Sequence, residues 1–172
     1  MSNPLFSAFR FEAKLRRSPQ IIAGSNAQED SNAIPGGEML GDGAFQECSG
    51  LQVEMDVQDY QEGGRNDGII RRVGWAKYTN IVLKRGMFYD RDGQVNDALW
   101  KWLQDIVSGK PVARYDGIIE VKSRDAKVVA TWVFERGLPA KISGPQLNAK
   151  SGEIAIEELH IAHEGLRLVT VE

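Results

Sequence analysis

The sequence predicts one mainly β domain, an antiparallel β-barrel or sandwich with a single flanking α-helix. Several segments alternate apolar and polar residues with a period of two, which is typical of strands that bury one face. One segment instead spaces its apolar residues as an amphipathic helix does. The 172 residues, of which 42% are hydrophobic, are enough for one domain with its own core, so we assign residues 1–172 to a single domain.

The strands are predicted from this alternation and from β-branched residues. Phe9–Leu15 alternates without a break, and Leu51–Gln58 continues the pattern over eight residues. Two later segments, Ile118–Lys122 and Val128–Glu135, flank the polar stretch 123–126 and therefore predict a hairpin. The remaining predicted strands are Tyr78–Arg85, Ile154–Ile161 and Leu166–Val171.

A helix of about three turns is predicted after position 97. Asn96 or Asp97 can accept the free N–H groups of its first turn. Its apolar stripe consists of Leu99, Trp100, Leu103, Ile106 and Val107. Trp102 lies about 200° from Trp100 around the helix, outside this stripe. We therefore expect the first four residues of this stripe to pack on the barrel, and Trp102 to lie at a subunit contact or beneath another loop.

Residues 16–44 interrupt the alternation and are predicted to form a long loop insertion. The stretch contains five glycines and two prolines, and its apolar side chains are scattered among polar ones. Ordering each residue costs roughly 1–2 kcal/mol of backbone entropy, which so few apolar side chains cannot offset. We expect this loop to be mobile in a free subunit and ordered against a neighbour in an assembly.

The sequence contains no recognisable catalytic or metal-binding grouping, so we predict no enzyme, no cofactor and no metal site. The single cysteine, Cys48, cannot form an intramolecular disulfide and is expected to be a small buried thiol. His160 and His163 lack a third ligand, and residues three apart in a strand point to opposite faces. The glycines within 63–68 lack the ending of a phosphate-binding loop. GxSxG and HExxH motifs are also missing, which argues against a hydrolase-like effector.

Composition and charge argue against nucleic acid and membranes as partners of this protein. The net charge of −3 argues against a nucleic-acid-binding protein, because such proteins are more often basic. The apolar runs are too short for a membrane-spanning helix. The N-terminal stretch carries Arg10, Glu12 and Lys14, unlike a signal peptide, so we expect a protein made in the cytoplasm without one.

Charge is divided sharply along the middle of the chain. Gln46–Glu62 contains five acidic residues and no basic one, whereas Arg65–Arg85 contains six basic residues and one acid. The turn-forming residues between them predict one hairpin with an acidic arm and a basic arm. These charges either pair across the hairpin or form two edges that complement a displaced second copy.

Seven short motifs, taken in order from Phe6 to about Leu166, resemble the phage tail tube protein family. That family includes the inner-tube subunits of contractile injection systems. The motifs are Phe45–Leu51 (FQECSGL), Tyr60–Gly64 (YQEGG), Lys77–Ile81 (KYTNI), Leu83–Gly86 (LKRG), Leu99–Trp102 (LWKW), Ser143–Pro145 (SGP) and His160–Leu166 (HIAHEGL).

The resemblance implies a structural role. In such systems six copies join their sheets into a ring, and the rings stack into a hollow tube inside a sheath. Sheath contraction drives the tube into a target and releases cargo. The implied partners are further copies of the chain, sheath and baseplate proteins and protein cargo in the lumen. The protein would then reside in a phage-tail-like particle, first cytoplasmic and then extracellular.

Two alternatives stay close to this family, and a third comes from another class. The loop at 16–44 replaces what is expected to be a short turn in relatives, which fits a tube-initiating ring at the baseplate. A phage virion tail tube is the second alternative. A monomeric barrel that binds a small ligand is the third, and it requires an interior cavity of roughly 300–1,000 Å³.

The predicted assembly interface lies mainly on the hairpin from Glu54 to Lys84. Its glycines and its divided charge suggest that the tip, Tyr60–Arg72, reaches an adjacent subunit or ring. The residues assigned to this interface are Tyr60, Arg65, Arg71, Arg72 and Trp102.

Overall fold

A computed structural model describes residues 10–19, 39–40, 45–64, 68–88, 93–150 and 152–169. Within these residues the chain forms nine β-strands and one α-helix, so the predicted fold class is confirmed. The elements are β1 (Phe11–Arg17), β2 (Glu47–Ser49), β3 (Val53–Tyr60), β4 (Ile70–Tyr78), β5 (Ile81–Gly86), α1 (Ala98–Val107), β6 (Tyr115–Lys122), β7 (Val128–Ser143), β8 (Ile156–Ala162) and β9 (Gly165–Val169).

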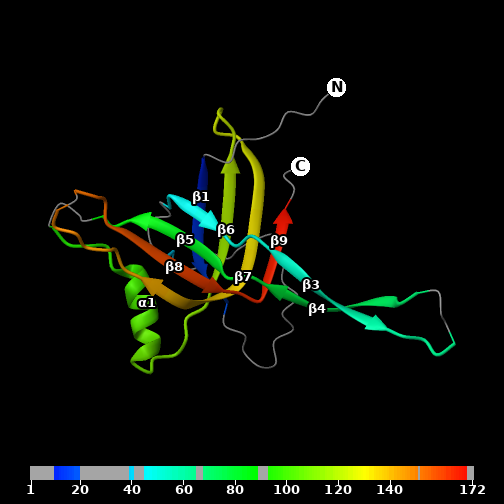
Figure 1. The fold of residues 1–172 in the computed structure, drawn as a ribbon. Coiled ribbons are helices and arrows are strands. Elements are labelled where there is room, and N and C mark those ends of the chain that lie inside the picture. Colours follow the sequence, from blue (N-terminus) through cyan, green and yellow to red (C-terminus); the bar gives the residue numbers. More distant parts are fainter. Residues whose placement is uncertain are drawn as a thin grey trace.

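Strand β7 joins the two layers of the body. Its first part pairs with β6 on one side and β9 on the other, and its last part pairs with β8. The strand order is β1-β6-β7-β8-β5-β2, and every pairing is antiparallel. Figure 1 shows β7 running along β6 and then turning toward α1 beside β8. One strand of 16 residues therefore serves both layers.

A β-bulge marks the turn in β7. Along this stretch β6 advances by two residues while β7 advances by three, so one residue of β7 is extra. Arg136 lies in this stretch with a φ of 54°, and its backbone N–H donates to Asp116 Oδ1 over 2.8 Å. The Ser18 hydroxyl donates to the same oxygen over 2.6 Å. These hydrogen bonds satisfy polar groups where regular pairing is interrupted.

The core lies between the two layers. Alternate residues of β1, β5, β6 and β8 point into it, as period-two patterning requires. Phe134 of β7 is fully buried there, and its ring occupies the space that a Cβ at Gly117 would take, 2.0 Å from a ring carbon. The most deeply buried apolar residues are Ala13, Leu15, Ile81, Leu83, Leu99, Ile119, Phe134, Leu159 and Ile161.

Helix α1 packs on the body through residues on two sides. Leu99 is buried as predicted, and Asn96 Oδ1 accepts a hydrogen bond from the Ala98 backbone N–H over 3.2 Å. Trp102 is only 4% exposed. Its Nε1 donates to the Ala113 carbonyl over 2.7 Å, and its ring meets Tyr115 edge-on at 4.8 Å. The chain after the helix folds back over this tryptophan.

Of the two placements expected for Trp102, the structure has the second, in which another segment covers it. Helical spacing identified the stripe facing the barrel, but it carried no information about the connection to β6. Trp102 belongs to the core of the single subunit.

A buried ion pair fixes the helix to the sheet. Arg85 of β5 and Glu157 of β8 are direct neighbours in the register, and each side chain is 2% exposed. Arg85 donates from Nε to Glu157 Oε1 and from Nη2 to the Asn96 carbonyl. Trp100 Nε1 donates to Glu157 Oε2 over 2.9 Å. The pair thus links α1, and the segment before it, to two strands.

Most strand boundaries differ from the sequence prediction, and β7 in particular continues to Ser143 instead of ending at Glu135. The predicted strand Tyr78–Arg85 is divided, since β4 ends at Tyr78 and β5 begins at Ile81. The strand predicted at Ile154–Ile161 begins at Ile156. The first two residues of the predicted loop at 16–44 belong to β1, and Leu40 is buried and donates its N–H to the Leu15 carbonyl. Most of that loop lies outside the described residues, as does the expectation about its mobility.

The first prediction concerns Trp102. Trp102→Ala should lower the free energy of unfolding by about 3–5 kcal/mol, because it leaves a cavity and removes a buried hydrogen bond. Urea denaturation of the free subunit measures this loss. Trp75→Ala is the matched control, since Trp75 is 81% exposed, and it should change stability by less than about 0.5 kcal/mol. Equal losses in the two variants would contradict the placement of Trp102.

The second prediction concerns the glycine beside Phe134. Gly117→Ala should lower the free energy of unfolding by about 1–3 kcal/mol, because the new methyl group would overlap the Phe134 ring. Gly152→Ala is the control, since a Cβ there meets no atom within 4 Å. Thermal unfolding of the two variants compares them directly, and a stable Gly117→Ala protein would show that the layers are not so closely packed.

Candidate assembly surface

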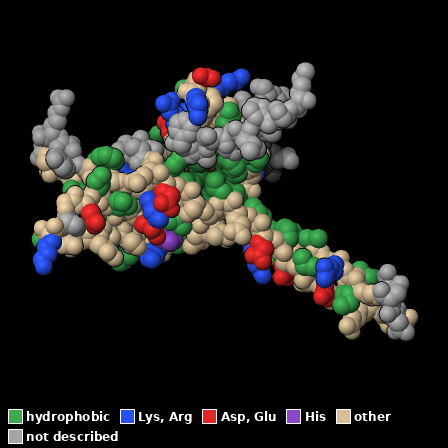
Figure 2. All heavy atoms as spheres, turned by 45° about the horizontal axis from the view of Figure 1, so that its top comes forward, with side chains coloured by type: hydrophobic (Ala, Val, Ile, Leu, Met, Phe, Trp, Pro, Cys, Tyr) green, Lys and Arg blue, Asp and Glu red, His purple; other side chains and the backbone are tan. Residues whose placement is uncertain are grey.

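The most unusual surface of the molecule is a hairpin that extends away from the body. In the described residues β3 and β4 pair only with each other and form a separate two-stranded sheet. Figure 2 shows this arm beyond the body, with apolar, acidic and basic side chains along it. An isolated two-stranded hairpin is at best marginally stable in water, so further contacts are needed to support it.

A β-bulge sets which side chains share a face of the hairpin. The pairing passes from Met55–Ala76 to Val57–Val73, so Gly74 and Trp75 together oppose Asp56. A Cβ at Gly74 would lie 3.2 Å from the Asp56 carboxylate. The bulge places Trp75 on the face opposite to that of Met55 and Val57.

One face of the hairpin is apolar and open to solvent. Four of its apolar side chains are between 44% and 72% exposed. They are Val53, Met55, Val57 and Val73. Exposed apolar side chains gathered on one face are characteristic of protein–protein contact sites.

The opposite face of the hairpin carries an aromatic and cationic group. The Arg72 guanidinium lies 4.3 Å above the centre of the Tyr60 ring, within cation–π range. Trp75 lies farther along the same face and is 81% exposed. Tyr, Trp and Arg are the residue types that contribute most to binding energy at protein interfaces.

Ion pairs cross the hairpin at two places. Arg71 Nε lies 3.5 Å from Asp59 Oδ1, and Lys77 Nζ lies 3.5 Å from Asp56 Oδ1. The expected cross-strand pairing is therefore present. Exposed pairs of this kind contribute only about 0.2–1 kcal/mol each. They align the strands but do not bury the apolar face.

The root of the hairpin is held tightly against the body. Gly50 has a φ of +83°, and a Cβ there would lie 2.1 Å from the Asn80 carbonyl oxygen. Only glycine tolerates both the conformation and the close approach. His163, in the turn between β8 and β9, places Nε2 3.0 Å from the Thr79 carbonyl oxygen. The hairpin is thus fixed where it leaves the sheet.

The two histidines have different surroundings. His163 also contacts the rings of Tyr78 and Phe134, and its Nδ1 lies 3.0 Å from the Gly165 carbonyl oxygen. His160 Nε2 lies 2.5 Å from Glu158 Oε1, and this hydrogen bond is the main reason why the pKa of Glu158 is lowered. Lys84 also lowers that pKa through its charge. The described residues contain no group of three or more His, Cys, Asp or Glu that could hold a metal ion.

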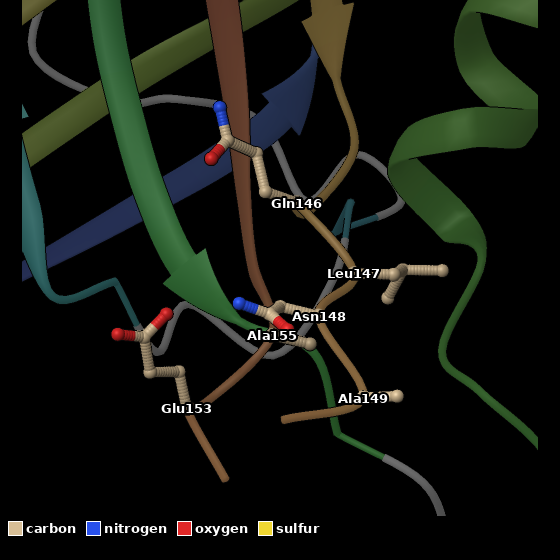
Figure 3. A pocket seen from close by; sticks show the side chains of 6 residues that line it. All are labelled: Gln146, Leu147, Asn148, Ala149, Glu153 and Ala155. Atoms are coloured by element: carbon tan, nitrogen blue, oxygen red, sulfur yellow. The ribbon is translucent and has the colours of Figure 1, made fainter. Parts of the chain in front are cut away.

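A shallow pocket lies at the other end of the body. Its volume is about 410 Å³. Figure 3 shows the side chains of Gln146, Asn148 and Glu153 on one side of the loop and that of Leu147 directed toward α1. Ala149 and Ala155 complete the lining.

A family model described as T4-like virus tail tube protein gp19 matches residues 7–167. The chain belongs to this tail tube family. The match includes the hairpin, the helix and both layers. No curated protein sequence matches this tail tube protein. In the part of the chain that the structure describes, no helix is long and apolar enough to cross a membrane.

The fold of this tail tube protein is similar to that of chains in several cryo-EM structures. One is from the anti-feeding prophage baseplate, 6-fold symmetrised (TM-score 0.73, 22% identity, covering 100% of this chain and 99% of that chain). Another is from the anti-feeding prophage tube-terminating cap (TM-score 0.73, 20% identity, covering 99% of this chain and 95% of that chain). A third is from the PVC sheath–tube complex of an extracellular contractile injection system in the extended state (TM-score 0.71, 21% identity, covering 97% of this chain and 93% of that chain).

The structure brings together three of the five predicted interface residues. Tyr60, Arg71 and Arg72 lie on the outer half of the hairpin. Arg65 lies outside the described residues, and Trp102 lies in the core. The sequence analysis missed Trp75 and the apolar face of the hairpin. Alternation in β3 was a usable signal for that face, but the bulge in β4 hid the partner strand.

The third prediction concerns Cys48 of this tail tube protein. Cys48 is half-buried rather than fully buried as expected, and burial raises the pKa of its thiol from 9.0 to about 12. Because the thiolate is the reactive form, labelling by a maleimide at pH 8 should be at least 100-fold slower in the folded protein than in urea. Rates followed by mass spectrometry test this, and equal rates would mean that the thiol is accessible.

Proposed function

We propose that this protein is the inner-tube subunit of a contractile, phage-tail-like injection system. Copies join into hexameric rings, and the rings stack into a hollow tube within a sheath. Sheath contraction drives the tube into a target, and the tube carries cargo. Membership of the tail tube family supports the tube role, and the similar folds in contractile injection particles support the type of system.

The extended hairpin is the observation on which this proposal depends most. A two-stranded arm with an exposed apolar face is poorly suited to a free monomer. A second copy of the chain can cover that face and remove it from water. The 6-fold symmetry in the description of the related baseplate supports six copies in each ring.

The proposed partners are sheath and baseplate proteins. The related chains come from a sheath–tube complex, a baseplate and a tube-terminating cap. The protein then resides in a phage-tail-like particle and has a structural rather than an enzymatic role. A specialised ring at the baseplate, or the tail tube of a phage virion, are closely related forms of the same proposal.

A small-ligand-binding barrel is not favoured by any observation. The pocket of about 410 Å³ lies at an exposed loop rather than between the layers. Side chains such as Phe134 and Ile161 fill the space between the layers and are fully buried.

The fourth prediction tests the role of the hairpin tip. Arg71→Glu combined with Arg72→Glu should reduce tube formation at least tenfold, because it reverses the charge that faces the neighbouring copy. The free energy of unfolding should change by less than about 1 kcal/mol, since both side chains are exposed. Electron microscopy measures the number and length of tubes, and thermal unfolding monitors the subunit.

A control variant with the same net charge tests whether assembly depends on where the charges are reversed. Arg124→Glu combined with Lys127→Glu makes the same change of net charge in the turn between β6 and β7. This control should assemble better than the hairpin variant. Normal tubes from the hairpin variant would mean that the arginines are only solvated.

A further inference from the structure

We propose that the pocket lined by residues 146–149, 153 and 155 of one copy receives the Arg72 and Trp75 face of a neighbouring copy's hairpin. The inference rests on the proposed function, because it requires that copies assemble. It adds the surface that accepts the hairpin and the chemistry that recognises it. The partner is a second copy of this chain.

The hairpin presents groups that are ready to enter a pocket. Arg72 is held above the Tyr60 ring, so its guanidinium is already oriented and loses less freedom on binding. The Trp75 indole is 81% exposed and brings both an apolar surface and an N–H donor. A receiving surface must therefore supply an anion, hydrogen-bond acceptors and some apolar contact.

The pocket supplies these three features. Glu153 provides a carboxylate, and among the described residues it forms no ion pair. The side-chain carbonyl of Gln146 lies on the same side of the loop as Glu153 (Figure 3). Leu147 is 87% exposed and offers apolar surface beside the pocket. A guanidinium on the Glu153 carboxylate and an indole on Leu147 would satisfy both partners.

The positions of the two surfaces favour contact between copies. Figure 1 shows the hairpin at one end of the subunit and the loop between β7 and β8 at the opposite end. The hairpin of a subunit therefore does not reach its own pocket. A contact between opposite ends of two copies is heterologous, so it can repeat from copy to copy in a ring or a stack.

A charge exchange tests this pairing. Arg72→Glu and Glu153→Arg should each reduce tube formation at least tenfold, whereas the two changes combined should restore it to within threefold of the unchanged protein. Arg72→Glu combined with Asp125→Arg is the control, because it makes the same charge change at an unrelated exposed turn. That control should not restore assembly. Each variant should also have the same thermal unfolding midpoint as the unchanged subunit, which shows that it is folded.

A cross-link supplies the second measurement. Trp75→Cys combined with Ala149→Cys should give disulfide-linked chains on oxidation of assembled tubes, while Val73→Cys combined with Ala149→Cys should not. The native Cys48 is half-buried and its thiol has a raised pKa, so it contributes little background. The number of chains joined together, measured on a non-reducing gel, shows whether the contact repeats from copy to copy.

The outcomes separate the two proposals. Restored assembly together with the specific cross-link supports the pairing. Tubes of the unchanged protein, with neither rescue by the charge exchange nor the cross-link, overturn the pairing and leave the proposed function intact. An unchanged protein that stays monomeric even in the parent particle overturns both.

Discussion

The sharing of β7 between two layers is the constraint on which the rest of the structure depends. Its first half is held between β6 and β9, and its second half pairs with β8, so neither layer can move without the other. The change of direction requires the bulge at Arg136, whose backbone N–H is satisfied by Asp116. Close packing of the layers in turn requires that Gly117 leave room for the Phe134 ring. Everything else, including the helix and the hairpin, is attached to this junction.

The body and the hairpin follow opposite physical rules. The body buries alternate apolar side chains of its strands and pairs charges across neighbouring strands, as Lys14–Glu120 and Glu12–Lys122 do between β1 and β6. The hairpin instead leaves four large apolar side chains in water and has only weak exposed ion pairs. Its root is nevertheless fixed, because Gly50 and His163 hold the strands where they leave the body. A rigid root combined with an uncovered arm suits a subunit whose folding is completed by its neighbours.

Sequence patterning succeeded where one face of an element is buried and failed where the chain departs from regular geometry. Alternation identified β1, β3 and the β6–β7 hairpin, because a period of two follows directly from a half-buried strand. It missed β4, since Gly74 and Trp75 share one partner and break the period. The helical stripe was found, but the pattern left two placements open for Trp102, because it does not give the path of the segment that follows the helix and covers this side chain. The divided charge around Tyr60–Arg72 located the candidate surface, while its apolar face and the pocket depend on tertiary structure.

The buried pair of Arg85 and Glu157 restricts which sequences this protein can reach through mutation. Loss of either member alone leaves an uncompensated charge in the interior, which typically costs about 3–5 kcal/mol, a large part of the stability of a domain of this size. Replacement of both by well-packed apolar residues is often neutral, yet it requires two simultaneous changes. Trp100 raises this barrier further, because its indole N–H would lose its acceptor in the same step. The three positions therefore change together or not at all, and descendants of this sequence are expected to retain the set long after their surfaces have diverged.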